Sequence, residues 1–318
     1  MPGSVDLRQA HPVGRRACFA VPSGLTCKTS AWCQISLDLL LMQGNFVMKR
    51  NVSPLLPLIF ILMCRAQVWP QEEPQKILFF PATKIFPPLT ADALTHQISL
   101  SHVTNDRDWI GTIGGSLPLA QLHLEDAELQ VSVAASTFNR LITPPGLTVY
   151  TTDFKVDFPL DVRLSETSFR LALGHYSCHF EDDGIELLGK HSIQSIKDYY
   201  MLAVARDVEL IGGHVYLAGH WIHHNVPMRD KNWEIQLGGE AGNLSVSRLV
   251  SLYCAIDLKL KQEVSWGSTQ SYQAGVRLLM NGIRALRFAY TVRRGFDERG
   301  QFFDQHEDVE ILSVFVDF

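Results

Sequence analysis

The sequence has no long apolar segment beyond residue 66, and it carries little excess charge of either sign. Its formal net charge is -5 and its mean hydropathy is +0.04. A membrane-spanning helix needs about 20 consecutive apolar residues, so a bundle of such helices is excluded. A surface that binds nucleic acid is not expected either, because polyanions are bound through clustered Lys and Arg. If the chain meets a membrane, strands must make the contact.

One short apolar run lies near the start of the chain. Residues 54–64 (PLLPLIFILMC) follow the basic start Met48-Lys49-Arg50 and precede the small residue Ala66. Basic start, short apolar core and small residue together indicate a signal peptide over 48–66, cleaved after Ala66. A membrane anchor would need about twice this apolar length. We expect residues 1–47 to be a wrongly included upstream extension or a disordered one, because an export signal should be N-terminal.

The next segment, 67–95, is rich in proline, at Pro70, Pro74, Pro81, Pro87 and Pro88. Proline lacks the N–H that a strand ladder needs, so this density predicts a segment outside the barrel wall. We expect it either to line the periplasmic rim or to tuck into the pore.

Residues 96–318 consist of segments of about ten residues in which apolar and polar side chains alternate, separated by turn residues. In one of them, Leu252, Cys254 and Ile256 share one face, while Asp257 and Lys259 share the other. A period of two identifies a strand. We predict twelve strands, near 96–104, 109–122, 129–140, 149–163, 167–178, 199–210, 213–223, 232–241, 251–264, 270–280, 285–294 and 308–318.

Two features favour a membrane barrel over a soluble periplasmic β-sandwich that binds a small ligand, which is the alternative. Short turns alternate with longer connections at 141–148, 179–198, 224–231 and 295–307, the stretch after Ala241 being an exception. The last strand ends on Phe318, which resembles the C-terminal signal that outer-membrane barrels present to the barrel-assembly machinery. The prediction is an all-β, transmembrane, up-and-down antiparallel β-barrel of about twelve strands in the bacterial outer membrane, with lipid and that machinery as partners.

Three motifs carry a family resemblance: FRLALGHYSCHFED over 169–182, the step Ala205-Arg206-Asp207, and GQFF over 300–303. The chain resembles, from about Phe79 to Phe318, a bacterial family catalogued as domain of unknown function 1207. Cys178 stands where a second serine is expected. The resemblance implies an envelope protein with a barrel-like fold, and it implies no activity.

The charged side chains of the strands are predicted to face the interior of the barrel. Both signs are present in similar number, so they can pair and close the pore or line a narrow channel of unknown cargo. Nothing in the sequence calls for a metal or a cofactor. The predicted pore-lining residues are Lys155, Asp157, Asp161, Arg163, Arg170, Glu234, Glu240, Asp257, Lys259, Lys261, Glu263, Arg277, Arg287 and Arg293.

A second hypothesis is a lipid hydrolase or deacylase. His175 and Ser177 lie two apart on one strand with the lipid-facing parity of Phe169, and this His-x-Ser pair resembles that of outer-membrane phospholipases, in which imidazole activates the hydroxyl. Asp182 or Asp183, just beyond the strand, could orient the histidine or hold a calcium ion. The Asn-Gly that follows the phospholipase serine is absent. In the simpler interpretation these polar residues mark the end of the lipid-facing stretch.

Three further expectations concern single residues. Large aromatic side chains near strand ends should form girdles at the membrane interfaces. His220, His223 and His224 are interpreted as a solvated loop rather than a metal site, because alternation separates their faces. Cys178 and Cys254 should lie at opposite ends of the barrel and form no bridge. The girdle candidates are Trp109, Tyr150, Trp221, Trp233, Trp266 and Tyr272.

Overall fold

The computed structural model describes residues 76–143, 146–189, 191–280 and 284–317. The predicted extension 1–47, signal peptide 48–66 and terminal Phe318 lie outside the described residues. The strands are β1 (Ile77–Phe79), β2 (Ile98–Val103), β3 (Asp108–His123), β4 (Glu128–Ile142), β5 (Thr148–Leu164), β6 (Thr167–Phe180), β7 (Ser195–Val208), β8 (Gly213–Val226), β9 (Trp233–Ser245), β10 (Val250–Lys261), β11 (Gly267–Met280), β12 (Arg284–Gly295) and β13 (Val309–Asp317). The helices are α3 (Asp182–Leu188) and the 3-10 turns η1 (Glu209–Ile211), η2 (Gln262–Val264) and η3 (Gly300–Phe302).

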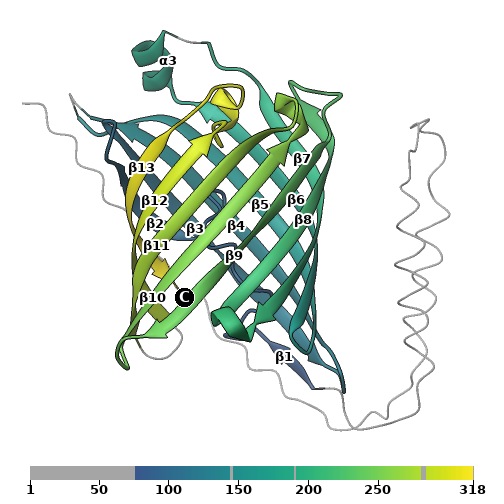
Figure 1. Ribbon diagram of the computed structural model, residues 1–318. Helices are drawn as coiled ribbons and strands as arrows, with labels where there is room; N and C mark the ends of the chain where they lie inside the picture. Colours follow the sequence, from purple (N-terminus) through teal and green to yellow (C-terminus); the bar gives the residue numbers. More distant parts are fainter. Residues whose placement is uncertain (1–75, 144–145, 190, 281–283, 318) are drawn as a thin grey trace, which may run out of the picture. The chain divides into compact units, whose positions relative to one another are not determined.

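Strands β2 to β13 form a closed antiparallel barrel (Figure 1). Each pairs with its neighbour in sequence, and β13 pairs with β2, from Ile311 with Val103 to Val316 with Ile98, which closes the ring. The predicted fold of twelve antiparallel strands is therefore confirmed. The additional strand β1 extends the wall at one point, since Ile77–Phe79 pairs with Ala120–Leu122 of β3.

Alternation of side chains makes the two faces of the wall different. On β7, Leu202 is 65% exposed and points outward, whereas Ala203 is 2% exposed and points inward. The same holds on β10, where Leu252 and Ile256 are exposed and Asp257 and Lys259 are buried. The outward face is apolar and the interior contains most of the charge, as the period of two requires.

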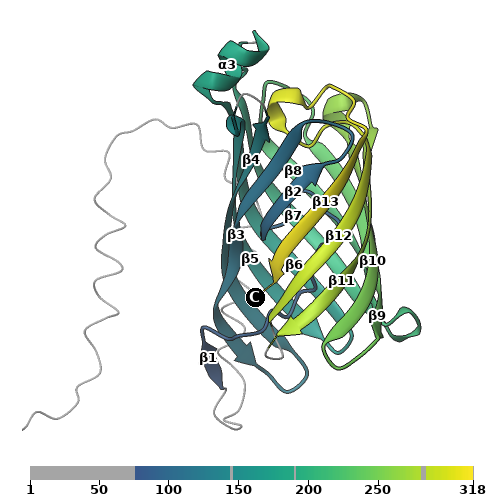
Figure 2. The same ribbon diagram turned by 90° about the vertical axis from the view of Figure 1, so that its left-hand side faces the viewer.

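The connections distinguish the two ends of the barrel. One end, here called the long-loop end, carries the connections β4–β5, β6–β7, β8–β9 and β12–β13, with α3 and η3 (Figures 1 and 2). The opposite end, here called the short-turn end, carries the turns β3–β4, β5–β6, β7–β8, β9–β10 and β11–β12, with η1 in the turn β7–β8. The expected long exception after Ala241 is wrong, because β9 continues past a bulge to Ser245 and β10 begins at Val250. The expected loop 179–198 is likewise partly helix and partly strand, since β7 begins at Ser195.

One of the predicted girdle aromatics is wrongly placed. Tyr150 is buried and donates a hydrogen bond to Asp108 inside the barrel. A β-bulge causes this: Arg140 pairs with Thr151 and Leu141 with Val149, so Tyr150 is the extra residue and its side chain reverses face. Four of the remaining girdle candidates are exposed on the outward side: Trp221, Trp233, Trp266 and Tyr272. In the described part of the chain no helix is long and apolar enough to cross a membrane.

Candidate functional site

Residues 80–97, here called the inner segment, run through the barrel interior. Its backbone is bound by inward-facing side chains from strands around the ring. Ser168 on β6 donates to the carbonyl of Ile85 at 2.9 Å, and Lys155 on β5 donates to that of Leu94 at 3.1 Å. The ring of His214 on β8 lies 2.9 Å from the carbonyl of Pro88. A proline-rich chain with unpaired carbonyls is thus satisfied by wall side chains instead of a ladder.

Apolar and ionic contacts also fix the inner segment. Phe86 and Leu89 pack with Met201 and Ala172 of the wall in one buried cluster. His96 joins two strands: its Nδ1 lies 2.9 Å from Oγ of Ser136 on β4, and its Nε2 lies 2.8 Å from Oδ2 of Asp157 on β5. Thr90 donates to Glu240 on β9.

Lys259 connects the inner segment to a loop from the long-loop end. Its Nζ lies 2.6 Å from Oδ1 of Asp92 and 2.8 Å from Oε2 of Glu298. Lys261, two residues along β10, lies 3.4 Å from Oε1 of the same Glu298. All of these side chains are buried, and a buried ion pair is tolerated only when its partners are in place. We call this group, Asp92, Lys259, Lys261 and Glu298, the lysine cluster.

The loop 296–308 folds into the long-loop end and is anchored on β6. The Gln301 amide donates to the carbonyls of Cys178 and Ile193, at 2.9 and 2.8 Å. A Cβ added at Gly300 would lie 2.1 Å from Sγ of Cys178 and 2.5 Å from Oγ of Ser195, so only glycine fits this approach. Two motifs of the family resemblance, over 169–182 and 300–303, are therefore in contact. Their shared role in the fold is to hold this loop inside the wall.

A second ionic group secures the same loop. Arg140 on β4 lies 2.7 Å from Oδ2 of Asp108 and 2.6 Å from Oε1 of Glu307. Arg299 lies 3.1 Å from Oε1 of Glu307 and donates to the hydroxyl of Tyr150 at 2.7 Å. The bulge in β5 turns the side chain of Tyr150 inward and so places its hydroxyl in this ionic group.

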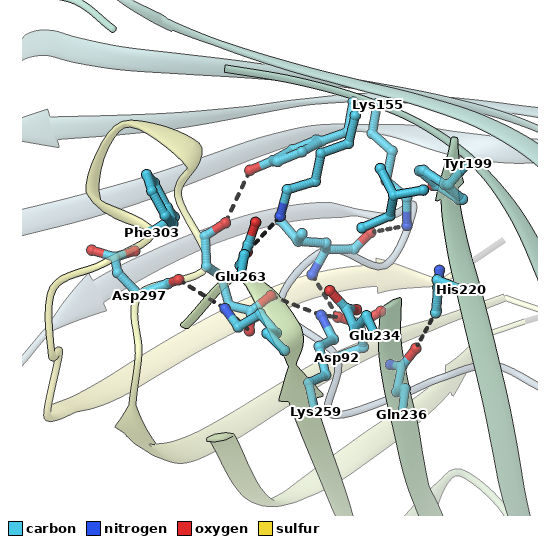
Figure 3. Close-up of a pocket in the computed structure, with 16 residues that line it drawn as sticks. Asp92, Lys155, Tyr199, His220, Glu234, Gln236, Lys259, Glu263, Asp297 and Phe303 are labelled. Atoms are coloured by element: carbon cyan, nitrogen blue, oxygen red, sulfur yellow. Dashed lines mark hydrogen bonds and ion pairs between the residues drawn. The ribbon is translucent and has the colours of Figure 1, made fainter. Parts of the chain in front are cut away.

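The inner segment separates two of the cavities inside the barrel. The larger, of about 510 Å³, lies toward the short-turn end and includes Phe86, Met201 and Asp317 in its lining. The smaller, of about 50 Å³, lies toward the long-loop end and is shown in Figure 3. Asp92, Lys155, His220 and Gln236 line both, so the partition lies at these residues. The larger volume suits a small ligand, whereas the smaller suits water.

Electrostatics fix the charge states of the groups at the partition. Burial opposes ionisation of Glu298, but the ammonium groups of Lys259 and Lys261 outweigh it and hold the pKa of that carboxyl well below its usual range. Burial acts in the same way on Asp92, and Lys259 and Lys155 outweigh it, so its pKa is also lowered. Burial lowers the pKa of His96 even though Asp157 opposes the shift. The carboxyl groups of Asp92 and Glu298 are therefore ionised, and His96 is neutral, at neutral pH.

All the predicted pore-lining side chains lie on the inward-facing side of the wall, and most have a partner of opposite charge. Arg170 binds Asp161 at 2.7 Å and Arg277 binds Glu240 at 2.7 Å. Glu263 binds Lys197 at 2.6 Å. That these residues line an open pathway stays a prediction. The inner segment contributes Asp92 and His96 to the same interior, which the strand pattern alone did not indicate.

The candidate hydrolase residues are not brought together as a nucleophile and its base. His175 and Ser177 do share the outward face of β6, but Nδ1 of His175 lies 2.6 Å from Oδ1 of Asp198 on β7. Asp182 begins α3 instead. Among the described residues no hydrogen bond joins His175 to Ser177 or to Asp182. Catalysis by these three residues stays a prediction without geometric support.

The histidines of β8 are dispersed, and the loop expected for them is wrong because β8 runs to Val226. His220 is buried beside Gln236, and His224 lies 2.8 Å from Asp198 outside the wall. A bulge opposite Asp198 and Tyr199 makes His223 the extra residue, which turns His224 outward. The described residues hold no group of three or more His, Cys, Asp or Glu placed to bind a metal. Cys178 is buried, Cys254 is exposed, and both are free.

Comparison with known proteins gives one family and a distant structural likeness. The family described as Protein of unknown function (DUF1207) matches residues 74–318. No curated protein matches the chain. Among solved structures, CdiB from Acinetobacter baumannii is 11% identical with a TM-score of 0.32, over 70% of this chain and 59% of CdiB. The chain thus spans less than two thirds of that protein's length.

Proposed function

The chain belongs to the DUF1207 family, and we propose that it is an integral barrel of the bacterial outer membrane whose interior is closed by its own inner segment. The observation that carries this proposal is the division of the closed wall into an apolar outward face and a charged, paired interior. In water such an outward face would be an unusually large exposed apolar surface. In a bilayer it is what a transmembrane barrel requires.

The arrangement of the interior favours a closed scaffold or a gated narrow channel over an open pore. The inner segment is bound by side chains from β4, β5, β6, β8, β9 and β10. Opposite charges on the wall are paired rather than presented to a pathway. Any transport would therefore require the inner segment to move, with the lysine cluster as the main contact to break.

Localisation and folding behaviour test this proposal directly. The protein expressed in a Gram-negative bacterium should sediment with outer membranes and resist extraction at high salt and alkaline pH. Folded protein should migrate faster in unheated than in heated detergent gels, because a hydrogen-bonded ring opens only on heating. Recovery in the soluble periplasmic fraction would refute the proposal and favour the soluble alternative.

A further inference from the structure

The ring that β2 and β13 close has a gap beside β3, because β2 is much shorter than β3. Strand β2 pairs with β3 only from Ser99–His102 to Trp109–Thr112, and β1 begins to pair at Ala120. In the part of the chain that the structure describes, no strand pairs with this side of β3 from Ile113 to Pro118. We call this stretch the seam. Figure 2 views the barrel from the side that carries β2, β3 and β13.

The seam lies in the apolar outward face of the wall and not at either end of the barrel. Ile113 and Leu117 on β3 are 68% and 52% exposed, and Leu100 and Val314 across the junction are also exposed. Unpaired backbone groups facing hydrocarbon cost several kcal/mol each. Strand edges in membranes are therefore normally absent, and one that occurs at this depth needs another polar surface beside it. Pro118 fits an unpaired edge because it has no N–H to satisfy.

The larger cavity lies directly behind the seam. Gly115 and Ser116 of β3 line it from one side, and Val316 and Asp317 of β13 from the other. Its volume of about 510 Å³ extends inward to Phe86, Leu89 and Met201 of the inner segment and the opposite wall. A cavity that has an apolar part around Phe86, Leu89 and Met201 and charged side chains elsewhere in its lining thus reaches the outward surface through an interruption in the wall.

We propose that the seam is a lateral opening through which an acyl chain of an amphipathic lipid enters the larger cavity from the bilayer. This inference rests on the proposed membrane location. Phe86, Leu89 and Met201 would contact the chain, while the exposed backbone of β3 and the carboxylate of Asp317 stay with the polar part of the molecule at the margin. The cavity has the size of a ligand site and a mixed lining, in which Phe86, Leu89 and Met201 offer apolar contacts and charged side chains such as Arg287 and Asp317 offer polar ones.

Photocrosslinking from the bilayer tests the opening. The full chain is expressed, purified from membranes and reconstituted with a phosphatidylethanolamine that carries a diazirine within one acyl chain, and adducts are located by peptide mass spectrometry. We expect adducts on outward residues such as Phe288 and also on inward Met201 and Leu89. Adducts on outward residues alone would overturn the lateral opening but leave the membrane location intact. Absence of all adducts would overturn the membrane location itself.

Matched variants on one strand separate entry through the seam from entry through the ends of the barrel. Ser116→Phe adds bulk on the cavity side of β3, and Leu117→Phe adds a similar ring on the lipid side. We expect the inward adducts to be largely lost in Ser116→Phe and retained in Leu117→Phe. Inward adducts that persist equally in both would refute the seam as the route. If Ser116→Phe does not fold, Ser116→Val, which adds less bulk at the same position, takes its place in the comparison.

Discussion

Asp92 and Glu298 share the ammonium group of Lys259, at 2.6 and 2.8 Å, although they are held in segments that enter the barrel from opposite ends. Asp92 comes with the inner segment from the short-turn end, and Glu298 comes with the loop 296–308 from the long-loop end. One wall lysine therefore ties both occupants of the interior to β10. Removal of that lysine would take away the ion pair of Asp92 and leave Glu298 with Lys261 alone.

Lys259→Met tests this connection. Removing one partner of a buried ion pair costs about 3–5 kcal/mol, because the remaining charge is left unpaired. We expect a lower unfolding temperature and, in planar bilayers, conductance steps that the unaltered protein lacks. Lys231→Met, in the β8–β9 connection, is the control and should change neither. A silent bilayer and an unchanged unfolding temperature for Lys259→Met would contradict the role given to the cluster.

Acidification should weaken the same contacts. The pKa of Glu298 in the folded protein is held below that of the unfolded chain, about 4.3. Its stabilising effect is therefore complete above that value and is lost as the pH falls through the range below it. The stability difference between the unaltered protein and Glu298→Gln should hold above about pH 5 and shrink as the pH falls from there towards about pH 3. Thermal unfolding at each pH measures it, and a constant difference would contradict the assignment.

Gly300→Ala tests the contact between the loop 296–308 and β6. The new Cβ must displace Cys178 or Ser195, and such overpacking costs about 1–3 kcal/mol. Gly146→Ala is a matched loop control, because a Cβ at Gly146 meets nothing within 4 Å. We expect a lower unfolding temperature and faster proteolysis of the loop for Gly300→Ala only. Equal unfolding temperatures and proteolysis rates for the two variants would show that the close approach at Gly300 does not contribute to stability.

The outward belt can be tested by placing a charge on it. Leu202 is 65% exposed on β7, whereas Leu210 is 94% exposed in η1 at the short-turn end. An arginine on the lipid face costs about 2–4 kcal/mol at the bilayer midplane and little near an interface. Leu202→Arg should reduce the yield of heat-modifiable barrel on refolding into lipid vesicles, and Leu210→Arg should not. Equal yields would argue against burial of Leu202 in hydrocarbon.

The sequence predicts the wall well because one physical rule, the period of two, acts on every strand. Leu252 and Lys259 on β10 illustrate it, and their faces follow directly from parity. The prediction fails where a bulge changes parity, as at Tyr150 and His224. No local pattern marks these positions, because the extra residue is defined only by the partner strand.

The interior could be predicted only in outline. The prolines of the segment 67–95 predict that it lies outside the wall, which is wrong for Ile77–Phe79, because these residues pair with β3 as β1. The prolines also do not indicate that Asp92 meets Lys259, 167 residues away. Glu298 and Gln301 lie in a connection without periodicity, so their inward position depends on the tertiary fold. The GQFF motif over 300–303 was the one feature of the sequence that drew attention to this loop. Its close approach to Cys178 explains why the motif begins with glycine.

Cys254 allows the most direct test of the central claim, that the outward face of the wall lies in hydrocarbon. It is exposed on β10, while Cys178 is buried. A bimane label on Cys254, in protein purified from the cell envelope and reconstituted, should be quenched by phospholipids brominated on their acyl chains and hardly by aqueous iodide, with Cys254→Ser as the background. Quenching by iodide and none by brominated lipid would contradict the account.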